Sequence, residues 1–259
     1  MRSVGRLLTL LISGTAAYYA YSFTRQNAAA LTQVLGAVGN RPQPMFPAGD
    51  AAKYDAGRWD GRRYVNESLG FSMSVPQDWH IADQDTTDAL TDRGISFVAN
   101  GDALLMRMAQ TAKATTIQLV LASEHAPGKP GKVNNNIVVT AESLRGYPGI
   151  ESAADYARAV EGVLRKTPLN YEFGVLKTRV SIGGMKAACL PASLRAGNGQ
   201  PEVQQRFYCV KMNDVALSFV LTYQDDIGFE KLRVVMNSIR FGAADSAQVE
   251  AVETVGAAD

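Results

Sequence analysis

The chain has 259 residues, of which 46% are hydrophobic and 20% are charged, as in globular proteins that bury a sizeable core. Its formal net charge is +1, so no strong field of one sign selects nucleic acid, and no basic stripe with interleaved aromatic residues points to such a partner. The two histidines exclude a histidine-rich metal cage, and the P-loop, G-x-S-x-G, H-E-x-x-H and C-x-x-C motifs are missing.

The N-terminal segment predicts targeting of the chain to a membrane. Residues 1–6 are basic, and residues 7–23 carry no charge and end in four aromatic residues. This pattern is typical of a signal anchor, whose aromatic belt sits at the membrane surface. Two alternatives stay open: removal of residues 1–17 as a signal peptide, which would give a secreted protein, and a buried core helix. Arg2 and Arg6 keep the N-terminus inside, so we expect a membrane-anchored domain outside the cytoplasm, periplasmic or extracellular.

A stalk and a tail flank the predicted folded part. Residues 24–60 contain Pro42, Pro44 and Pro47, which break regular structure and predict a linker between the membrane and the domain. Residues 243–259 contain four acidic residues and no basic one, which predicts a disordered acidic tail. We therefore place a single folded domain at 61–242.

Alternating apolar residues predict most of this domain to be antiparallel sheet. Phe71, Met73 and Val75 share one face of a strand, and residues 215–223 repeat the pattern with Val, Leu, Phe, Leu and Tyr, as half-buried strands do. Further strands are expected at 93–99, 103–110, 115–123, 135–142, 171–182, 185–194 and 203–212.

Two helices interrupt the strands. Residues 152–166 begin with a Ser152-x-x-Asp155 capping signal, and residues 226–239 have an apolar stripe. The last residues, 238–241, read as a short closing strand. Strands grouped together with helices at intervals predict an α+β fold, in which helices pack on a central antiparallel sheet.

The two cysteines, Cys189 and Cys209, flank a Gly-rich turn at 196–202, which predicts a hairpin. If this turn centres on Gly199, the cysteines are directly opposite each other, and opposed side chains are close enough for a disulfide. An exported compartment would favour the bond. The alternative is a pair of buried free thiols.

Acidic residues follow His80 and form the best candidate for chemistry. Asp83, Asp85, Asp88 and Asp92 can bind a cation, although they lack the glycine and the spacing of a calcium loop. Acids at this kind of position more often cap a short helix. We therefore expect no metal, no cofactor and no catalytic residue, with a hydrolase or metal-dependent enzyme using His80 as an alternative.

The segment 124–136 is rich in Pro, Gly and Asn and is the candidate surface for a protein partner. Its candidate contacts are His125, Lys129, Lys132 and Asn134, because loops held on a rigid sheet often carry binding. A plain hairpin tip without a binding role is the competing interpretation.

The chain resembles the PsbP/Mog-like families, which include bacterial DcrB-type envelope proteins. The resemblance covers about 62–241 and rests on short motifs: Tyr64, Asn66, Gly70-Phe71-Ser72, Pro76, Trp79, the Gly-Gly hairpin of 181–194 and the strand-helix-strand ending of 217–241. It implies an α/β/α sandwich and a binding, scaffolding or assembly role, with no catalytic residues to carry over. The chain departs from the DcrB type because it has a long stalk and lacks a lipobox cysteine.

Three functions follow from these patterns. We expect a non-catalytic, membrane-tethered, outward-facing binding or assembly protein with a protein partner in the cell envelope. A small-ligand carrier is the second hypothesis, and it predicts a closed apolar pocket of about 300 Å³ or more between sheet and helix. The third is the secreted enzyme that uses His80.

Overall fold

The structure is a computed structural model that describes residues 55–99, with only the backbone of 93–99, and then 106, 116–126, 133–145, 147–165, 171–194 and 203–242. The predicted N-terminal helix at 7–23, the acidic tail at 243–259 and most of the stalk lie outside these residues. β1 (Arg58–Asp60) falls in the last residues of the predicted stalk, so the folded part begins before the predicted boundary.

Two antiparallel sheets and three helices make up the described fold. The small sheet has the order β1-β2-β3-β12, with β2 (Arg63–Asn66), β3 (Phe71–Ser74) and β12 (Arg240–Phe241). The large sheet has the order β4-β5-β6-β11-β10-β9-β7, and β8 also pairs with β9. Its strands are β4 (His80–Ile81), β5 (Thr116–Ser123), β6 (Asn136–Ser143), β7 (Tyr171–Phe173), β8 (Lys177–Ile182), β9 (Met185–Leu194), β10 (Val203–Met212) and β11 (Val215–Tyr223).

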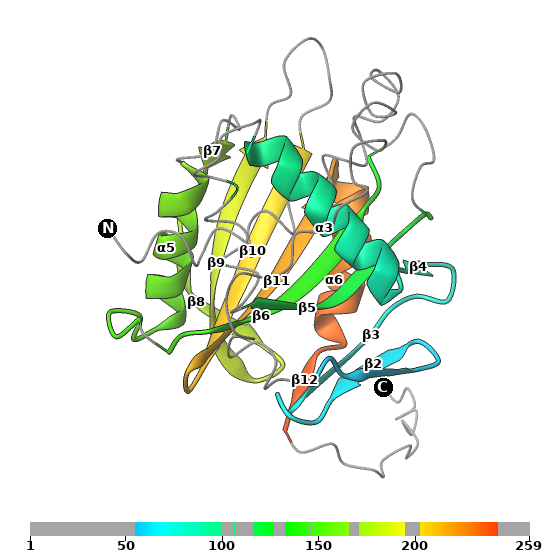
Figure 1. The fold of residues 1–259 in the computed structure, drawn as a ribbon, viewed down its shortest axis with the longest axis horizontal. Helices are drawn as coiled ribbons and strands as arrows, with labels where there is room; N and C mark the ends of the chain where they lie inside the picture. The colour runs from blue at the N-terminus through cyan, green and yellow to red at the C-terminus, as the bar shows by residue number, and fades with distance from the viewer. Residues whose placement is uncertain are drawn as a thin grey trace, which may run out of the picture.

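Helices cover both faces of the large sheet. α3 (Gln84–Ala99) and α5 (Ala153–Leu164) lie on one side of it (Figure 1), where Leu90, Tyr156 and Val160 belong to one apolar cluster with the sheet. α6 (Asp226–Asn237) and the small sheet pack on the other face and share the second cluster. The predicted α+β fold is therefore confirmed, with a small second sheet that the sequence did not reveal.

The central strand β11 shows what two covered faces do to a strand. Leu217, Phe219 and Leu221 face α6 and the small sheet, which confirms the predicted alternation. The residues that alternate with them are buried as well, including Ser218 and Thr222 at 0% exposure. The prediction of a half-buried strand was wrong here, because alternation cannot show whether a second layer covers the polar face.

Local capping fixes both predicted helices. Ser152 accepts a hydrogen bond from the backbone of Asp155, and the Asp155 carboxylate accepts one in return, which completes the predicted capping box. Asp225 caps α6 in the same way by accepting from the backbone N–H of Gly228. α6 ends at Asn237, because Ser238 leaves the helix and bonds β3 through its hydroxyl and the backbone of Ser74.

Three strand predictions need correction. Residues 93–99 belong to α3, since the helix that Asp83 starts by accepting from the N–H of Thr86 continues through this apolar run. Such short runs do not separate strand from helix by periodicity. Within 103–110 only Met106 is described, and it is helical. The range 171–182 is two strands, β7 and β8, both paired with β9.

The segment from Tyr64 to Trp79 builds the core that joins the two sheets. Tyr64, Phe71 and Trp79 are at most 3% exposed. The Phe71 ring lies 5.9 Å from that of Phe219 in β11 and 6.0 Å from that of Phe241 in β12. These aromatic contacts hold the small sheet against the large one, as edge-to-face and tilted ring pairs do.

The predicted disulfide is contradicted by the strand register. β9 and β10 form the predicted hairpin, but Cys189 lies opposite Tyr208, and Cys209 lies opposite Ala188. The register is thus one residue away from the predicted one, and one residue turns a side chain to the other face of a sheet. Both cysteines are buried free thiols.

Burial makes these thiols unreactive in the folded state. It raises the pKa of Cys209 to about 12, although Ser218 beside the sulfur opposes the shift, and it also raises the pKa of Cys189. Because the thiolate is the reactive form, we expect Ellman's reagent to modify the native protein slowly at mildly alkaline pH. Both thiols should react at once in concentrated guanidinium chloride. If the denatured, unreduced chain shows no free thiol, the two cysteines form a disulfide after all.

A buried hydrogen bond ties α5 to the sheet. The Tyr156 hydroxyl donates to the Glu142 carboxylate at 2.8 Å, and both residues are 0% exposed. Burial and the nearby Glu142 raise the pKa of Tyr156 well above its ordinary value, so the phenol stays protonated and keeps donating. Removing this donor leaves part of a buried acid without its partner, which is costly.

We expect Tyr156→Phe to lower the free energy of unfolding by about 2 kcal/mol, because the variant leaves a buried carboxyl oxygen of Glu142 without its donor. Tyr171→Phe is the control, since its hydroxyl donates to the Gln205 side chain at 2.7 Å in a partly buried place, and it should cost about 1 kcal/mol. Urea denaturation measures both values. Equal losses would mean that the buried place of the Tyr156 hydrogen bond adds nothing to its contribution.

Candidate binding groove

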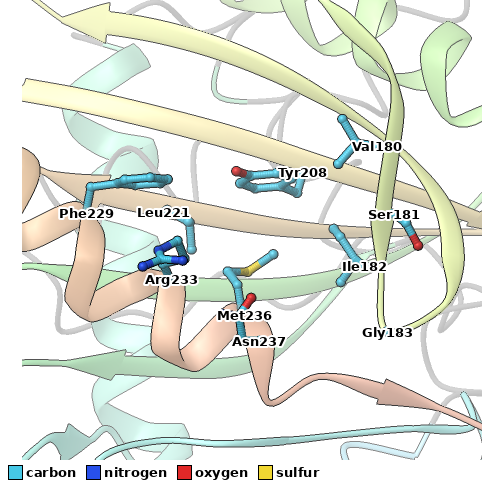
Figure 2. Close-up of a pocket in the computed structure, with 10 residues that line it drawn as sticks. All are labelled: Val180, Ser181, Ile182, Gly183, Tyr208, Leu221, Phe229, Arg233, Met236 and Asn237. Carbon is cyan, nitrogen blue, oxygen red and sulfur yellow. The ribbon is translucent and has the colours of Figure 1, made fainter. Parts of the chain in front are cut away.

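A groove lies on the second face of the large sheet, between α6 and β8. Its volume is about 280 Å³. β10 and β11 provide its floor, and α6 and the end of the β8–β9 hairpin provide its walls (Figure 2). The lining residues are Val180, Ser181, Ile182, Gly183, Tyr208, Leu221, Phe229, Arg233, Met236 and Asn237.

The β8–β9 hairpin closes one end of the groove. Its turn consists of Gly183 and Gly184, which have φ values of 54° and 86°, as a two-residue turn of this hand requires. A Cβ atom on Gly183 would lie 2.8 Å from the carbonyl oxygen of Ile239 and 3.0 Å from the Phe241 ring. Glycine therefore lets the hairpin touch the chain between α6 and β12, and this contact fixes the wall that β8 provides.

The side chains of the two walls face each other across the floor. Figure 2 shows Val180 and Ile182 of β8 pointing toward Tyr208, with Ser181 turned away. From α6, Phe229, Arg233 and Met236 reach the groove because residues three or four apart share a helix face. The exposed Arg233 forms an ion pair with Glu230 on the same helix. The groove is thus lined by apolar and polar groups in similar measure.

Arg206 lies beside Phe229, one of the residues that line the groove. Its guanidinium carbon is 3.8 Å from the centre of the Phe229 ring, and its Nε donates to the Tyr223 hydroxyl at 2.9 Å. Burial alone would lower the pKa of Arg206, but hydrogen bonds to Tyr208 and Tyr223 outweigh that effect and raise it. Two phenols and one aromatic face therefore hold a partly buried cation in place.

No carboxylate is paired with Arg206 in the part of the chain that the structure describes. Three acids lie within four residues of its contact Phe229 and have other contacts. Asp225 caps α6, Glu230 binds Arg233, and Asp226 interacts electrostatically with Tyr223, whose hydroxyl accepts from Arg206. A charge taken partly out of water without a counter-ion is uncommon in proteins. This cation beside the groove is therefore the most distinctive feature of the site.

The predicted partner loop is only partly described. Asn134 accepts a hydrogen bond from the backbone N–H of His125 and donates to its carbonyl oxygen, at 2.9 and 2.7 Å. These bonds close the base of the loop, so Asn134 has a structural role. Lys129 and Lys132 lie outside the described residues, and the proposed contact surface stays a prediction.

The acidic cluster after His80 belongs to the start of α3. Asp83 accepts from the side chain and backbone of Thr86, and these bonds lower the pKa of its carboxyl. Asp85, Asp88 and Asp92 are exposed. Among the described residues, no three His, Cys, Asp or Glu side chains are placed to hold a metal ion. The capping interpretation of this cluster is therefore confirmed for Asp83.

Sequence reasoning kept a pocket between sheet and helix as an alternative but named none of the residues that form the groove, although part of their signal was present. β10 was predicted, and its alternate residues Gln204, Arg206 and Tyr208 form a polar and aromatic row on one face. A large cation on the central part of a sheet, flanked by an aromatic residue, can mark a binding site. The contacts from Tyr223 and Phe229 could not be foreseen, because they depend on where α6 packs.

Comparison with known proteins places the fold beside several bacterial structures. The chain is similar to LpqN of Mycobacterium tuberculosis, described as involved in cell envelope biogenesis, with 13% identity, coverage of 66% of this chain and 83% of the other, and a TM-score of 0.39. A PsbP of the cyanobacterium Synechocystis has 12% identity, coverage of 79% and 98%, and a TM-score of 0.40. PsbP proteins are the group that the sequence resembles, and the narrower DcrB type stays a prediction.

These similarities are weak. No protein-family model matches the chain, and no curated protein matches it either. Identities near 12% and TM-scores below 0.5 leave the function to be argued from the chain's own residues. Within the described residues, no helix is both long and apolar enough to span a membrane, and residues 7–23 lie outside them.

Proposed function

We propose that the protein is a non-catalytic binding protein of the cell envelope, tethered by residues 7–23, with its domain outside the cytoplasm. The groove between α6 and β8 is its binding site. The observation that carries this proposal is the pre-formed hollow of 280 Å³ over β10, whose lining combines apolar side chains with polar groups from Tyr208, Arg233 and Asn237. Binding sites share this composition, since apolar walls supply affinity and the polar groups supply orientation.

The size of the groove favours a small occupant. Ligand pockets usually begin at about 300 Å³, and this groove of 280 Å³ falls at that lower limit. The exposed Arg233 and Asn237 in its lining leave it open on one side, unlike the closed pocket expected for a carrier. An open groove of this kind can exchange its occupant without a large movement of the chain.

The polar groups at the groove suit binding better than catalysis. Tyr208, Arg233 and Asn237 offer hydrogen-bond donors, and neither histidine is among the lining residues. General acid-base catalysis needs a base within hydrogen-bond distance of the reacting group. The groups present can orient a bound molecule, and binding is the function they support.

We expect phenylnaphthylamine, a neutral dye that fluoresces in apolar surroundings, to bind the full chain. Val180→Phe should weaken its affinity at least about fivefold, because the larger ring fills the wall where the dye's apolar body would lie. Val234→Phe is the matched control, since Val234 is 65% exposed and does not line the groove. Fluorescence titration gives both dissociation constants.

Two outcomes would contradict the groove as the binding site. The first is the absence of saturable dye binding to the wild-type chain, and the second is an equal loss of dye affinity in the two phenylalanine variants. Thermal melting of both variants confirms that each is folded before the comparison is made.

The tether has its own test. We expect the full chain to sediment with membranes in a bacterial host and to resist extraction by alkaline carbonate, because residues 7–23 would lie in the hydrocarbon core. Deletion of residues 1–23 should leave the chain in the soluble fraction. A mature protein shortened at its N-terminus and found free outside the membrane would replace the anchor with a cleaved signal peptide.

A further inference from the structure

We propose that the groove binds a small amphipathic anion, whose apolar body lies between α6 and β8 and whose carboxylate, sulfonate or phosphate group binds Arg206. This inference rests on the function proposed above and specifies its ligand. Three features of the described residues carry it: a cation without a paired carboxylate, free donor capacity on that cation, and a hollow whose lining residues Tyr208 and Phe229 also contact the cation.

The first feature is the missing counter-ion. Arg206 is partly buried, and its polar contacts are the phenols Tyr208 and Tyr223, with the Phe229 ring stacked at 3.8 Å. Aromatic faces and phenols stabilise a guanidinium ion but do not cancel its charge. Arg233 is paired with Glu230, but the exposed Lys177 opposite Cys189 adds a second positive charge near Arg206. Two cations without a paired carboxylate among the described residues favour an anion at this place.

The second feature is the geometry of the donors. A guanidinium group has five N–H donors in a planar fork, and the two phenols engage only part of them. The donors that remain match the two oxygens of a carboxylate, a sulfonate or a phosphate, which bind such forks in pairs. Stacking on Phe229 fixes the plane of the fork before any ligand arrives, so little side-chain entropy remains to be lost.

The third feature is the proximity of the hollow. Tyr208 and Phe229 line the groove and also contact Arg206. Leu221, another lining residue, lies directly opposite Arg206 in the β10–β11 register. An anion bound to Arg206 would therefore direct an attached apolar group onto the groove floor. A ligand with only one of the two parts would leave either the cation or the hollow unused.

A matched pair of dyes tests the inference. Anilinonaphthalene sulfonate and phenylnaphthylamine share their ring system, and only the first carries an anionic group. We expect the wild-type full chain to bind the sulfonate about tenfold more tightly, as a charge-assisted hydrogen-bonded pair would give. Arg206→Gln should remove this preference and leave the affinity for the neutral dye within about twofold.

The control variant is Arg158→Gln. It removes the same charge from α5, on the opposite face of the sheet, where Arg158 is exposed and pairs with Asp155. The preference for the sulfonate should persist in this variant, so a loss there would reveal a non-specific charge effect. A higher salt concentration should also weaken the binding of the sulfonate to the wild-type chain and leave the binding of the neutral dye unchanged. This measurement needs no mutation.

The possible results separate the two proposals. Equal affinities for both dyes in the wild-type chain would overturn the anion site and keep the groove as an apolar binding site. The same holds if Arg206→Gln weakens both dyes equally, which would give Arg206 a structural role. If neither dye binds the wild-type chain, the groove is not a binding site and both proposals fail. If Arg206→Gln does not fold, Arg206→Lys and the salt titration of the wild-type chain test the anion site instead. A preference for the sulfonate that does not change in either experiment would overturn it.

Discussion

The layer on the second face of the large sheet is narrower than the sheet itself, and the groove follows from that difference. α6 and the small sheet pack against β11 and its neighbours, where Phe219 contacts both Phe71 and Phe241. Beyond them, β10 carries Tyr208 and Arg206, which are only partly buried. On the first face, α5 packs against both β9 and β10. The same strand therefore belongs to the core on one side and to a binding surface on the other.

A single close approach connects the core and the groove. Gly183 follows β8, lines the groove and lies against Ile239 and Phe241. Phe241 belongs to the aromatic contacts that hold the small sheet in place. The position of the groove wall is thus set by the packing of the core, and any side chain larger than glycine at 183 would separate the hairpin from β12. A wall anchored in this way is rigid, which favours a pre-formed site.

The sequence predicted those features that depend on neighbours along the chain. Alternation located β5, β6, β9, β10 and β11, and the Ser152 and Asp155 pattern located the start of α5. The predictions that failed depended on other parts of the fold. The apolar run at 93–99 joined a helix begun by Asp83. The hairpin register differed by one residue, because the turn residues alone do not fix the centre of an eight-residue loop.

The candidate site also combines residues that the sequence could reveal with contacts that depend on the rest of the fold. Tyr208 and Arg206 were visible as alternate residues of a predicted strand, but a partly buried arginine is informative only when its surroundings are known. Tyr223 and Phe229 reach it from β11 and from the first turn of α6. The sequence gap between Arg206 and these partners is closed by the turn at Asn213 and by the Asp225 cap, neither of which indicates a binding site.

An arginine held among aromatic groups without an anion also affects the stability of the free protein. Its partial burial removes water from the guanidinium group, and hydrogen bonds to two phenols compensate for that loss. An anion that binds there adds a further interaction in the folded state alone, because the unfolded chain has no such site. Binding and folding are therefore linked, and the occupied groove stabilises the same contacts between α6, β10 and β11 that create it.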